Sequence, residues 1–205
     1  MNKNIFNDKK IVVASHNKGK VDEITDLLKP LNIDILSAKN FKLKEPIENG
    51  LSFEENALIK SSYVSKKTGI PSLSDDSGIC FSDLDNQPGI YSARWAGENK
   101  NFYSAMYKIN NLIKKIKNPN YNCFFVCALS LCWPDGENVT VSGQVEGKFS
   151  WPPKGKYGFG YDPIFIPLKY DQTFAEMKPE FKHSISHRAL AFKKLKSLCF
   201  PSLEN

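Results

Sequence analysis

Two long strand-like runs in the second half of the chain limit the possible folds more than any other feature. They cover residues 121–133 and 138–146, and only the turn Pro134-Asp135-Gly136-Glu137 separates them. Apolar runs bounded by turn residues predict β-strands. Helical patterns occur on both sides of these runs, so we expect an α/β or α+β fold with a mixed sheet.

The rest of the chain predicts further strands and helices from its periodicity and its breaks. Four strands are expected, at residues 10–14, 32–36, 72–74 and 164–166. Four helices are expected, and three of them cover residues 20–29, 102–117 and 187–199. The fourth begins at the capping box Ser52-Phe53-Glu54-Glu55 and ends at a break at residues 69–71. The strand at 72–74 would deliver two aspartates to its end, and Gly78 would permit a turn just after them. An extended run would then resume at residues 79–81.

The length suits one domain or two tightly joined lobes, and we expect residues 1–205 to form a single domain. No run approaches the roughly 20 apolar residues of a membrane span, and the start of the chain lacks a signal-peptide pattern. The five cysteines are odd in number and include no C-x-x-C pair, so we expect buried free thiols in a reducing compartment, the cytoplasm. The net charge of +6 is compatible with a nucleic acid, a small polyanion or solubility alone.

Asp75 and Asp76 are the sharpest candidates for chemistry. Adjacent carboxylates between apolar runs are electrostatically costly unless a cation compensates them. Neighbouring side chains of an extended segment point opposite ways, so one aspartate would face a site and the other would support it from behind. Such oxygen ligands suit Mg²⁺ bridging to phosphates, and the alternative is an Asx-turn with capping aspartates.

The segment Ser15-His16-Asn17-Lys18-Gly19-Lys20 lies between a predicted strand and a predicted helix. Such a corner presents free N–H groups and the positive end of the helix dipole, and it therefore suits phosphate. It is not a Walker A loop, because Ala14 and Val21 stand where that motif needs Gly and Ser or Thr. The alternative is an ordinary polar loop.

Several other residues are weaker candidates for binding. Glu48 is either a second magnesium ligand or a surface glutamate. Asn56 and Lys60 are spaced i, i+4 and share one helix face, which is either functional or solvated. Arg94 would contact phosphate or support Asp75.

Two later motifs suit a base or an anion. In Gly158-Phe159-Gly160-Tyr161-Asp162-Pro163, a ring would stack on a base and Asp162 would accept a hydrogen bond from it; the alternative is a tight loop with packed aromatics. In Ser184-Ile185-Ser186-His187-Arg188, preceded by Lys182, two basic residues open a helix against the dipole preference. That placement favours an anion or a purine edge nearby, and the alternative is a surface turn.

Six motifs, taken in order, resemble the inosine triphosphate pyrophosphatase family. They are S-H-N-K-G-K, S-F-E-E-N-A-L-I-K, D-D-S-G-I, P-G-I-Y-S-A-R, G-F-G-Y-D-P-I-F and S-I-S-H-R, and together they cover nearly the whole chain. The resemblance implies an α/β fold with an elongated mixed sheet and two lobes flanking a central nucleotide-binding cleft. It also implies a homodimer that needs Mg²⁺ and hydrolyses ITP, dITP and XTP to the monophosphate and pyrophosphate. We expect the protein to be cytoplasmic, with no nucleic-acid or membrane partner.

The resemblance also implies roles for individual residues. Glu48 and Asp76 would hold magnesium, and Asp76 would accept the proton of the attacking water. The resemblance gives substrate-binding roles to Ser15, His16, Asn17, Lys18, Gly19, Lys20, Ser77, Phe159, Gly160, Tyr161, Asp162, Lys182, His187 and Arg188. From the residues themselves we add three substrate-binding candidates, Asn56, Lys60 and Arg94.

The chain departs from the family pattern at a few positions. Ser15-His16 stands where the family often has Thr-Gly, Ala189 stands where Gly is usual, and Lys156-Tyr157 stands where smaller residues are common. Two alternative functions stay open, a pyrophosphatase with another base preference and a nucleotide- or nucleic-acid-binding module without catalysis. Against the second, acidic residues share the candidate loops and would repel a phosphate backbone in the absence of metal.

Overall fold

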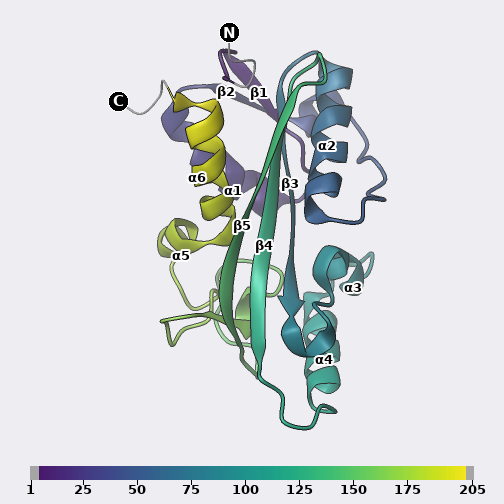
Figure 1. Cartoon of the computed structure of the whole chain (residues 1–205), viewed down its shortest axis with the longest axis vertical. Helices are drawn as coiled ribbons and strands as arrows, with labels where there is room; N and C mark the ends of the chain where they lie inside the picture. Colours follow the sequence, from purple (N-terminus) through teal and green to yellow (C-terminus); the bar gives the residue numbers. More distant parts are fainter. Residues whose placement is uncertain (1–4, 202–205) are drawn as a thin grey trace. The chain divides into compact units, whose positions relative to one another are not determined.

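A computed structural model describes residues 5–201 and contains one six-stranded sheet with helices packed on it (Figure 1). The strand order is β2-β1-β3-β4-β5-β6, with β1 parallel to β2 and β3, and β6 antiparallel to β5. This confirms the predicted mixed α/β class. The strands are β1 (Lys10–Val13), β2 (Asp34–Ser37), β3 (Ser72–Phe81), β4 (Asn122–Cys132), β5 (Asn138–Phe149) and β6 (Phe165–Pro167). The helices are α1 (Lys18–Leu28), α2 (Phe53–Thr68), α3 (Ser92–Trp95), α4 (Phe102–Ile113), α5 (Pro179–Ile185) and α6 (His187–Cys199).

The chain divides into two compact units. Unit 1 takes in the described residues up to Asp76, the segment Cys127–Gly143, and the described residues from Arg188 onward. Unit 2 takes in Ser77–Val126 and Gln144–His187. The strands β3, β4 and β5 each contribute residues to both units.

In unit 1, helices cover both faces of the sheet (Figure 1). Alternate residues of β1 point to opposite faces because a strand has a two-residue period. Ile11 and Val13 join the core formed with α1 and α6, whereas Val12 joins the smaller core beside Val64 of α2. These strand residues are fully buried or nearly so, as expected for a parallel strand covered on both faces.

In unit 2, the core combines the apolar face of α4 with a cluster of aromatic rings. Ile109 and Ile113 of α4 are buried in this core. Phe125 of β4 lies edge-on to Phe165, with ring centroids 4.8 Å apart, and is stacked with Phe174 at 5.9 Å. Such pairs add to the free energy gained by burying the rings themselves.

The structure corrects one prediction that bears on function. The strand expected to end at Ser74 continues through Asp75, Asp76 and Gly78 to Phe81, so neither the turn at Gly78 nor an Asx-turn at the aspartates is present. Each aspartate contacts a lysine ammonium, which lowers the cost of placing the carboxylates within a buried strand.

Other predicted elements are present with shifted ends. The first helix begins two residues earlier than expected, at Lys18, so Lys18 and Gly19 belong to its first turn rather than to the loop. The short helices α3 and α5 carry little periodicity and were not predicted. In the described part of the chain, no helix is long and apolar enough to cross a membrane.

Candidate active site

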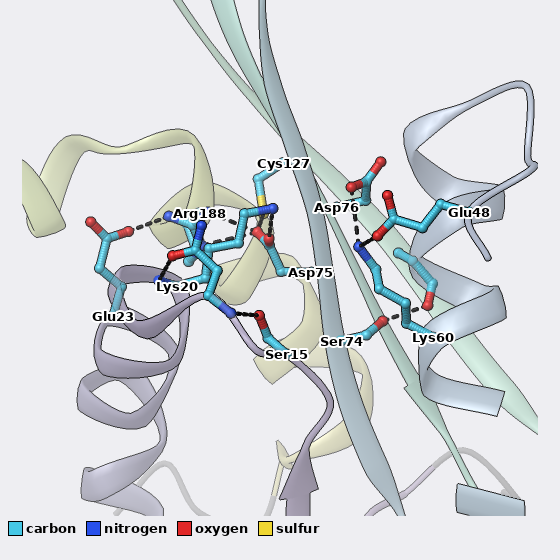
Figure 2. Close-up of polar contacts among 12 residues, drawn as sticks. Ser15, Lys20, Glu23, Glu48, Lys60, Ser74, Asp75, Asp76, Cys127 and Arg188 are labelled. Carbon is cyan, nitrogen blue, oxygen red and sulfur yellow. Dashed lines mark hydrogen bonds and ion pairs between the residues drawn. The ribbon is translucent and has the colours of Figure 1, made fainter. Parts of the chain in front are cut away.

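The strand β3 carries Asp75 and Asp76 to two separate clusters of polar side chains in unit 1. Figure 2 shows Asp75 with Lys20, Glu23, Cys127 and Arg188 on one face of the strand. Asp76 lies on the other face, beside α2. The two aspartates therefore have different surroundings, as the alternation of an extended segment predicts.

Asp75 is the centre of a buried ionic cluster. Its Oδ1 lies 2.6 Å from the Lys20 ammonium. Its Oδ2 accepts hydrogen bonds from Arg188 Nε at 3.0 Å and Nη2 at 2.8 Å, and from the Cys127 thiol at 2.9 Å. Arg188 also binds Glu23 through Nη1. Asp75 and Arg188 are each 1% exposed, so the centre of the cluster is closed to water, whereas Lys20 is partly exposed.

The cations around Asp75 decide its protonation state. Burial alone would raise the pKa of its carboxyl, but the charges of Arg188 and Lys20 outweigh burial and hold the pKa well below its usual range. Asp75 is therefore a permanently ionised group. The predicted supporting role of Asp75 agrees with this geometry.

The position of Arg188 in the first turn of α6 also has an explanation in the structure. A basic residue at a helix N-terminus predicts a nearby anion. The anions in contact with it are the carboxylates of Asp75 and Glu23. A substrate contact of Arg188 remains a prediction.

Asp76, Glu48 and Lys60 form the cluster on the other face of β3. The Lys60 ammonium lies 2.5 Å from Glu48 Oε1 and 3.1 Å from Asp76 Oδ1. Lys60 is buried on α2, and the i, i+4 face that it shares with Asn56 is buried rather than solvated. Glu48 is half-buried beside these residues, so it is not an isolated surface glutamate.

The environment of Asp76 suits proton transfer and cation binding. Burial raises the pKa of its carboxyl, and although Lys60 and Lys20 lower it, the net shift is upward. Among the residues that the structure describes, Asp76 Oδ2 is a buried oxygen without a hydrogen-bond partner. A buried carboxylate oxygen of this kind fits a hard cation. The described residues include no group of three or more His, Cys, Asp or Glu side chains suited to metal, so Glu48 and Asp76 would supply only part of a coordination shell.

Asn56 and Glu55 hold the loop between Glu48 and α2. Asn56 is fully buried, and its Oδ1 accepts a hydrogen bond from Gly50 N at 2.9 Å. The predicted capping box is half right. Ser52 Oγ accepts from Glu55 N at 3.1 Å, but the Glu55 carboxylate accepts from Leu51 N at 2.7 Å, one residue before the N-cap. These bonds fix the loop that carries Glu48.

The strand–helix corner at the start of α1 is built by short-range hydrogen bonds. Asn17 is the N-cap, and its Oδ1 accepts from Lys20 N at 3.3 Å. Ser15 is buried, and its Oγ accepts from Asn17 N at 3.2 Å. The first-turn N–H groups of Lys18 and Gly19 lie beside them, where a helix has no acceptors of its own. The corner therefore has the form of an anion-binding site.

His16, the departure from the family pattern, joins this corner to the loop that leads to Glu48. Its Nε2 lies 2.8 Å from Leu43 O. The Glu45 carboxylate accepts from His16 N at 3.2 Å and lies 3.3 Å from His16 Nδ1. One backbone N–H of the corner, that of His16, therefore already donates a hydrogen bond to the Glu45 carboxylate.

Unit 2 contains a second pair of buried charges. The Lys182 ammonium lies 2.6 Å from Asp162 Oδ2, which also accepts from Phe159 N at 2.9 Å. Gly158 has φ +71°, and a Cβ there would lie only 2.0 Å from Asp162 Oδ2. Lys182 also lies over the Phe159 ring, 4.9 Å from its centroid. This loop therefore fixes one aromatic ring, one acid and one base together.

The other candidates of unit 2 have different surroundings. Tyr161 is a core residue whose hydroxyl donates to Ser92 O at 2.8 Å, so of the two rings in its motif Phe159 is the more exposed. His187 is buried and stacks on Phe125 at 4.8 Å. Arg94 is exposed and lies over the Tyr91 ring at 4.9 Å. Further candidates are Gly160, with φ +66°, and the half-buried Ser77.

Three residues of these clusters were not predicted from sequence. Glu23 lies three residues after Lys20, a helical spacing that was available as a signal. Cys127 lies in an apolar strand, and Glu45 lies in a loop. Nothing in their local sequence indicates a contact with Asp75 or with His16.

Comparisons with known proteins agree with the motifs. The sequence profile of the Ham1 family matches residues 11–198. A dITP/XTP pyrophosphatase of Zymomonas mobilis is 50% identical over 93% of this chain and 91% of its own length, and one of Gluconobacter oxydans is 45% identical over 93% and 90%. The structure of a HAM1 protein from Coxiella burnetii superposes with a TM-score of 0.84 and 35% identity, covering 92% of this chain and 96% of that one. The chain therefore belongs to the Ham1 family.

Proposed function

We propose that this protein hydrolyses the non-standard purine nucleotides ITP, dITP and XTP to the monophosphate and pyrophosphate. The names of its relatives, which are dITP/XTP pyrophosphatases at 44–50% identity, support the reaction and the substrate class. The structural observation that carries the proposal is the cluster at Asp76, where two carboxylates share one lysine and a buried carboxylate oxygen has no partner within the described chain.

The triphosphate is assigned to the corner between β1 and α1. Ser15, Asn17 and the first turn of α1 offer hydroxyl, amide and N–H groups there, and the helix dipole favours negative charge. Lys20 adds a positive charge, which Asp75 holds in place at 2.6 Å. Displacement of the Glu45 carboxylate from His16 N would open a further donor.

Glu48 and Asp76 would hold a Mg²⁺ ion. When bound, the ion would neutralise phosphate charge and bring the phosphate oxygens and the two carboxylates together. The oxygen donor set and the buried unpartnered Oδ2 of Asp76 fit such an ion.

Asp76 is the proposed general base. It takes a proton from water as the water oxygen forms a bond to the α-phosphorus, and the bond from that phosphorus to the bridging oxygen breaks to release pyrophosphate. Burial raises the pKa of Asp76, and a carboxylate with a raised pKa accepts a proton more readily. Lys60 and Lys20 then stabilise the negative charge that develops on the phosphates.

Base selection is assigned to the Lys182 and Asp162 pair of unit 2, with Phe159 as the stacking ring. A 6-oxo group accepts hydrogen bonds, whereas the 6-amino group of adenine donates them. Hydrogen-bond donors on Lys182 and His187 therefore suit the 6-oxo group of hypoxanthine and xanthine. With adenine, the same donors would face the 6-amino group, which is itself a donor. A buried mismatch of this type discriminates strongly between substrates.

A substrate panel tests the proposed function. Pyrophosphate release is measured with Mg²⁺ and ITP, dITP, XTP, GTP, ATP or dTTP. The proposal requires the three non-standard purines to have the highest kcat/KM. A preference for dTTP or another standard nucleotide would favour the alternative of a pyrophosphatase with another base preference. Salt-dependent oligonucleotide binding without turnover would favour a binding module.

We further propose that the active protein is a homodimer in the cytoplasm and acts on free nucleotides rather than on nucleic acids or membranes. The five cysteines are buried and form no disulfide, which agrees with a reducing compartment. Sedimentation equilibrium of the purified chain tests the dimer. We propose that residues 1–205 act as one pyrophosphatase domain.

A further inference from the structure

The position between Glu48 and Asp76 already contains a cation, the ammonium of Lys60. Its Nζ lies 2.5 Å from Glu48 Oε1 and 3.1 Å from Asp76 Oδ1, and the lysine side chain is 7% exposed (Figure 2). Without this ammonium, two carboxylates in a largely dehydrated site would repel each other. Lys60 therefore does electrostatically what a bound metal ion would do there.

The charges of the cluster make metal and ammonium competitors. One ammonium and two carboxylates leave a single net negative charge. A divalent metal added alone would leave an excess positive charge and a metal ion beside the Lys60 ammonium. That excess is costly because Lys60 is buried and its surroundings screen charge poorly.

A nucleotide removes this conflict. Its phosphates bring several negative charges, which can accept the ammonium while the metal binds the carboxylates. The lysine is suited to the exchange, because its ammonium is a compact charge on a flexible four-carbon stem. The described residues offer no cluster of three or more metal-ligand side chains, so phosphate oxygens would also complete the coordination shell.

We propose that Lys60 is an internal placeholder for the metal ion, which keeps Glu48 and Asp76 together before substrate arrives and which moves to phosphate when metal and nucleotide bind together. The inference rests on the proposed function for the identity of the phosphate ligand. Its consequence is that metal alone binds weakly and that metal and nucleotide strengthen each other's binding.

Binding of Mn²⁺ alone tests the placeholder without any turnover. The dissociation constant is measured by electron paramagnetic resonance for the wild type, Lys60→Met, Lys60→Arg and Lys66→Met. Removing the ammonium should tighten Mn²⁺ binding by at least about tenfold, because the competing charge is gone. Lys60→Arg keeps the charge and should bind as weakly as the wild type. Lys66 is an exposed lysine of the same helix, so Lys66→Met should change nothing.

If Lys60→Met does not fold, a second measurement tests the placeholder role of Lys60. Mn²⁺ affinity of the wild type is compared with and without a saturating, non-hydrolysable dITP analogue, corrected for the Mn²⁺–nucleotide complex in solution. Equal affinities, or a Lys60→Met protein that binds Mn²⁺ no more tightly than the wild type, would overturn the placeholder. A wild type that releases no pyrophosphate from ITP, dITP or XTP would overturn the proposed function instead.

Discussion

Arg188 donates two hydrogen bonds to one oxygen of Asp75, from Nε at 3.0 Å and from Nη2 at 2.8 Å, although 113 residues separate them in the chain. Both side chains are almost completely buried. The pair ties the first turn of α6 to the middle of β3. It also explains why Asp75, next to the proposed base Asp76, is itself withdrawn from acid–base chemistry.

Asp75→Asn should therefore be strongly destabilising. The substitution removes one carboxylate charge from the buried Arg188, which still contacts Glu23, and breaking a buried ion pair on one side costs about 3–5 kcal/mol. Chemical unfolding in urea measures the loss. Asp22→Asn, at an exposed position of α1, is the matched control and should change stability by less than about 0.5 kcal/mol. If Asp75→Asn lowers the free energy of unfolding by less than about 1 kcal/mol, the proposed stabilising role of the Asp75–Arg188 pair is wrong.

The contacts of His16 and Glu45 should matter for substrate binding rather than for folding. His16→Ala removes the ring contacts with Leu43 O and the Glu45 carboxylate, so the loop leading to Glu48 is held to the phosphate corner less firmly. Loss of one or two such hydrogen bonds, at about 1 kcal/mol each, should raise KM by about twofold to tenfold and leave kcat nearly unchanged. Glu45→Ala removes the same contact with His16 Nδ1 but also frees His16 N as a phosphate donor, so it should raise KM less than His16→Ala does. Because the two substitutions share the Nδ1 contact, steady-state kinetics of the double variant should show less than the summed effect. Full additivity would mean that the two residues act separately.

Gly158 offers a sharp test of the Asp162 and Lys182 pair. Gly158→Ala places a Cβ within 2.0 Å of Asp162 Oδ2 and should displace the carboxylate from Phe159 N and from Lys182. We expect kcat/KM for dITP to fall by at least about tenfold, the cost of one charge-assisted hydrogen bond. Gly136 also has positive φ but no neighbour within 4 Å. Gly136→Ala therefore carries only the backbone strain, about 1 kcal/mol, and should keep full activity. Equal kinetics of the two variants would contradict the role of the pair.

The cysteines should be unreactive in the folded protein. Burial raises the pKa of the Cys80 thiol to about 12 and that of Cys199 to about 11. A pH of 8 lies well below both pKa values, so the two thiols stay protonated. The thiolate is the form that reacts. Ellman's reagent at pH 8 should therefore detect no rapidly reacting thiol in the native protein and all five after unfolding in guanidinium. A rapid native reaction would show that at least one thiol is accessible.

The sequence predicts the helices and strands well where the hydrophobic periodicity is clear and where turn-forming residues mark the ends. The last helix begins at His187 and ends at Cys199 as expected, and the two long strands are present. It fails at Asp75 and Asp76, because local rules place adjacent aspartates at a strand end. Only the cations brought by α1, α2 and α6 make a buried position acceptable, and those contacts join residues distant in the chain.

In the candidate site too, some features follow from local sequence and others depend on tertiary contacts. The i, i+4 spacing of Asn56 and Lys60 correctly places them on one face, but it does not distinguish a buried face from a solvated one. The partners Glu23, Glu45 and Cys127 carry no local signal strong enough to be selected. Their roles arise from tertiary contacts, which a single sequence does not contain.

The most direct test of the account is pyrophosphate release from dITP with Mg²⁺ by the wild type, Asp76→Asn and the control Asp22→Asn. Removing a general base typically costs a factor of about 10² to 10⁴ in rate, so Asp76→Asn should lose at least about a hundredfold in kcat. Asp22→Asn should match the wild type. An Asp76→Asn protein that releases pyrophosphate at close to the wild-type rate would contradict the account.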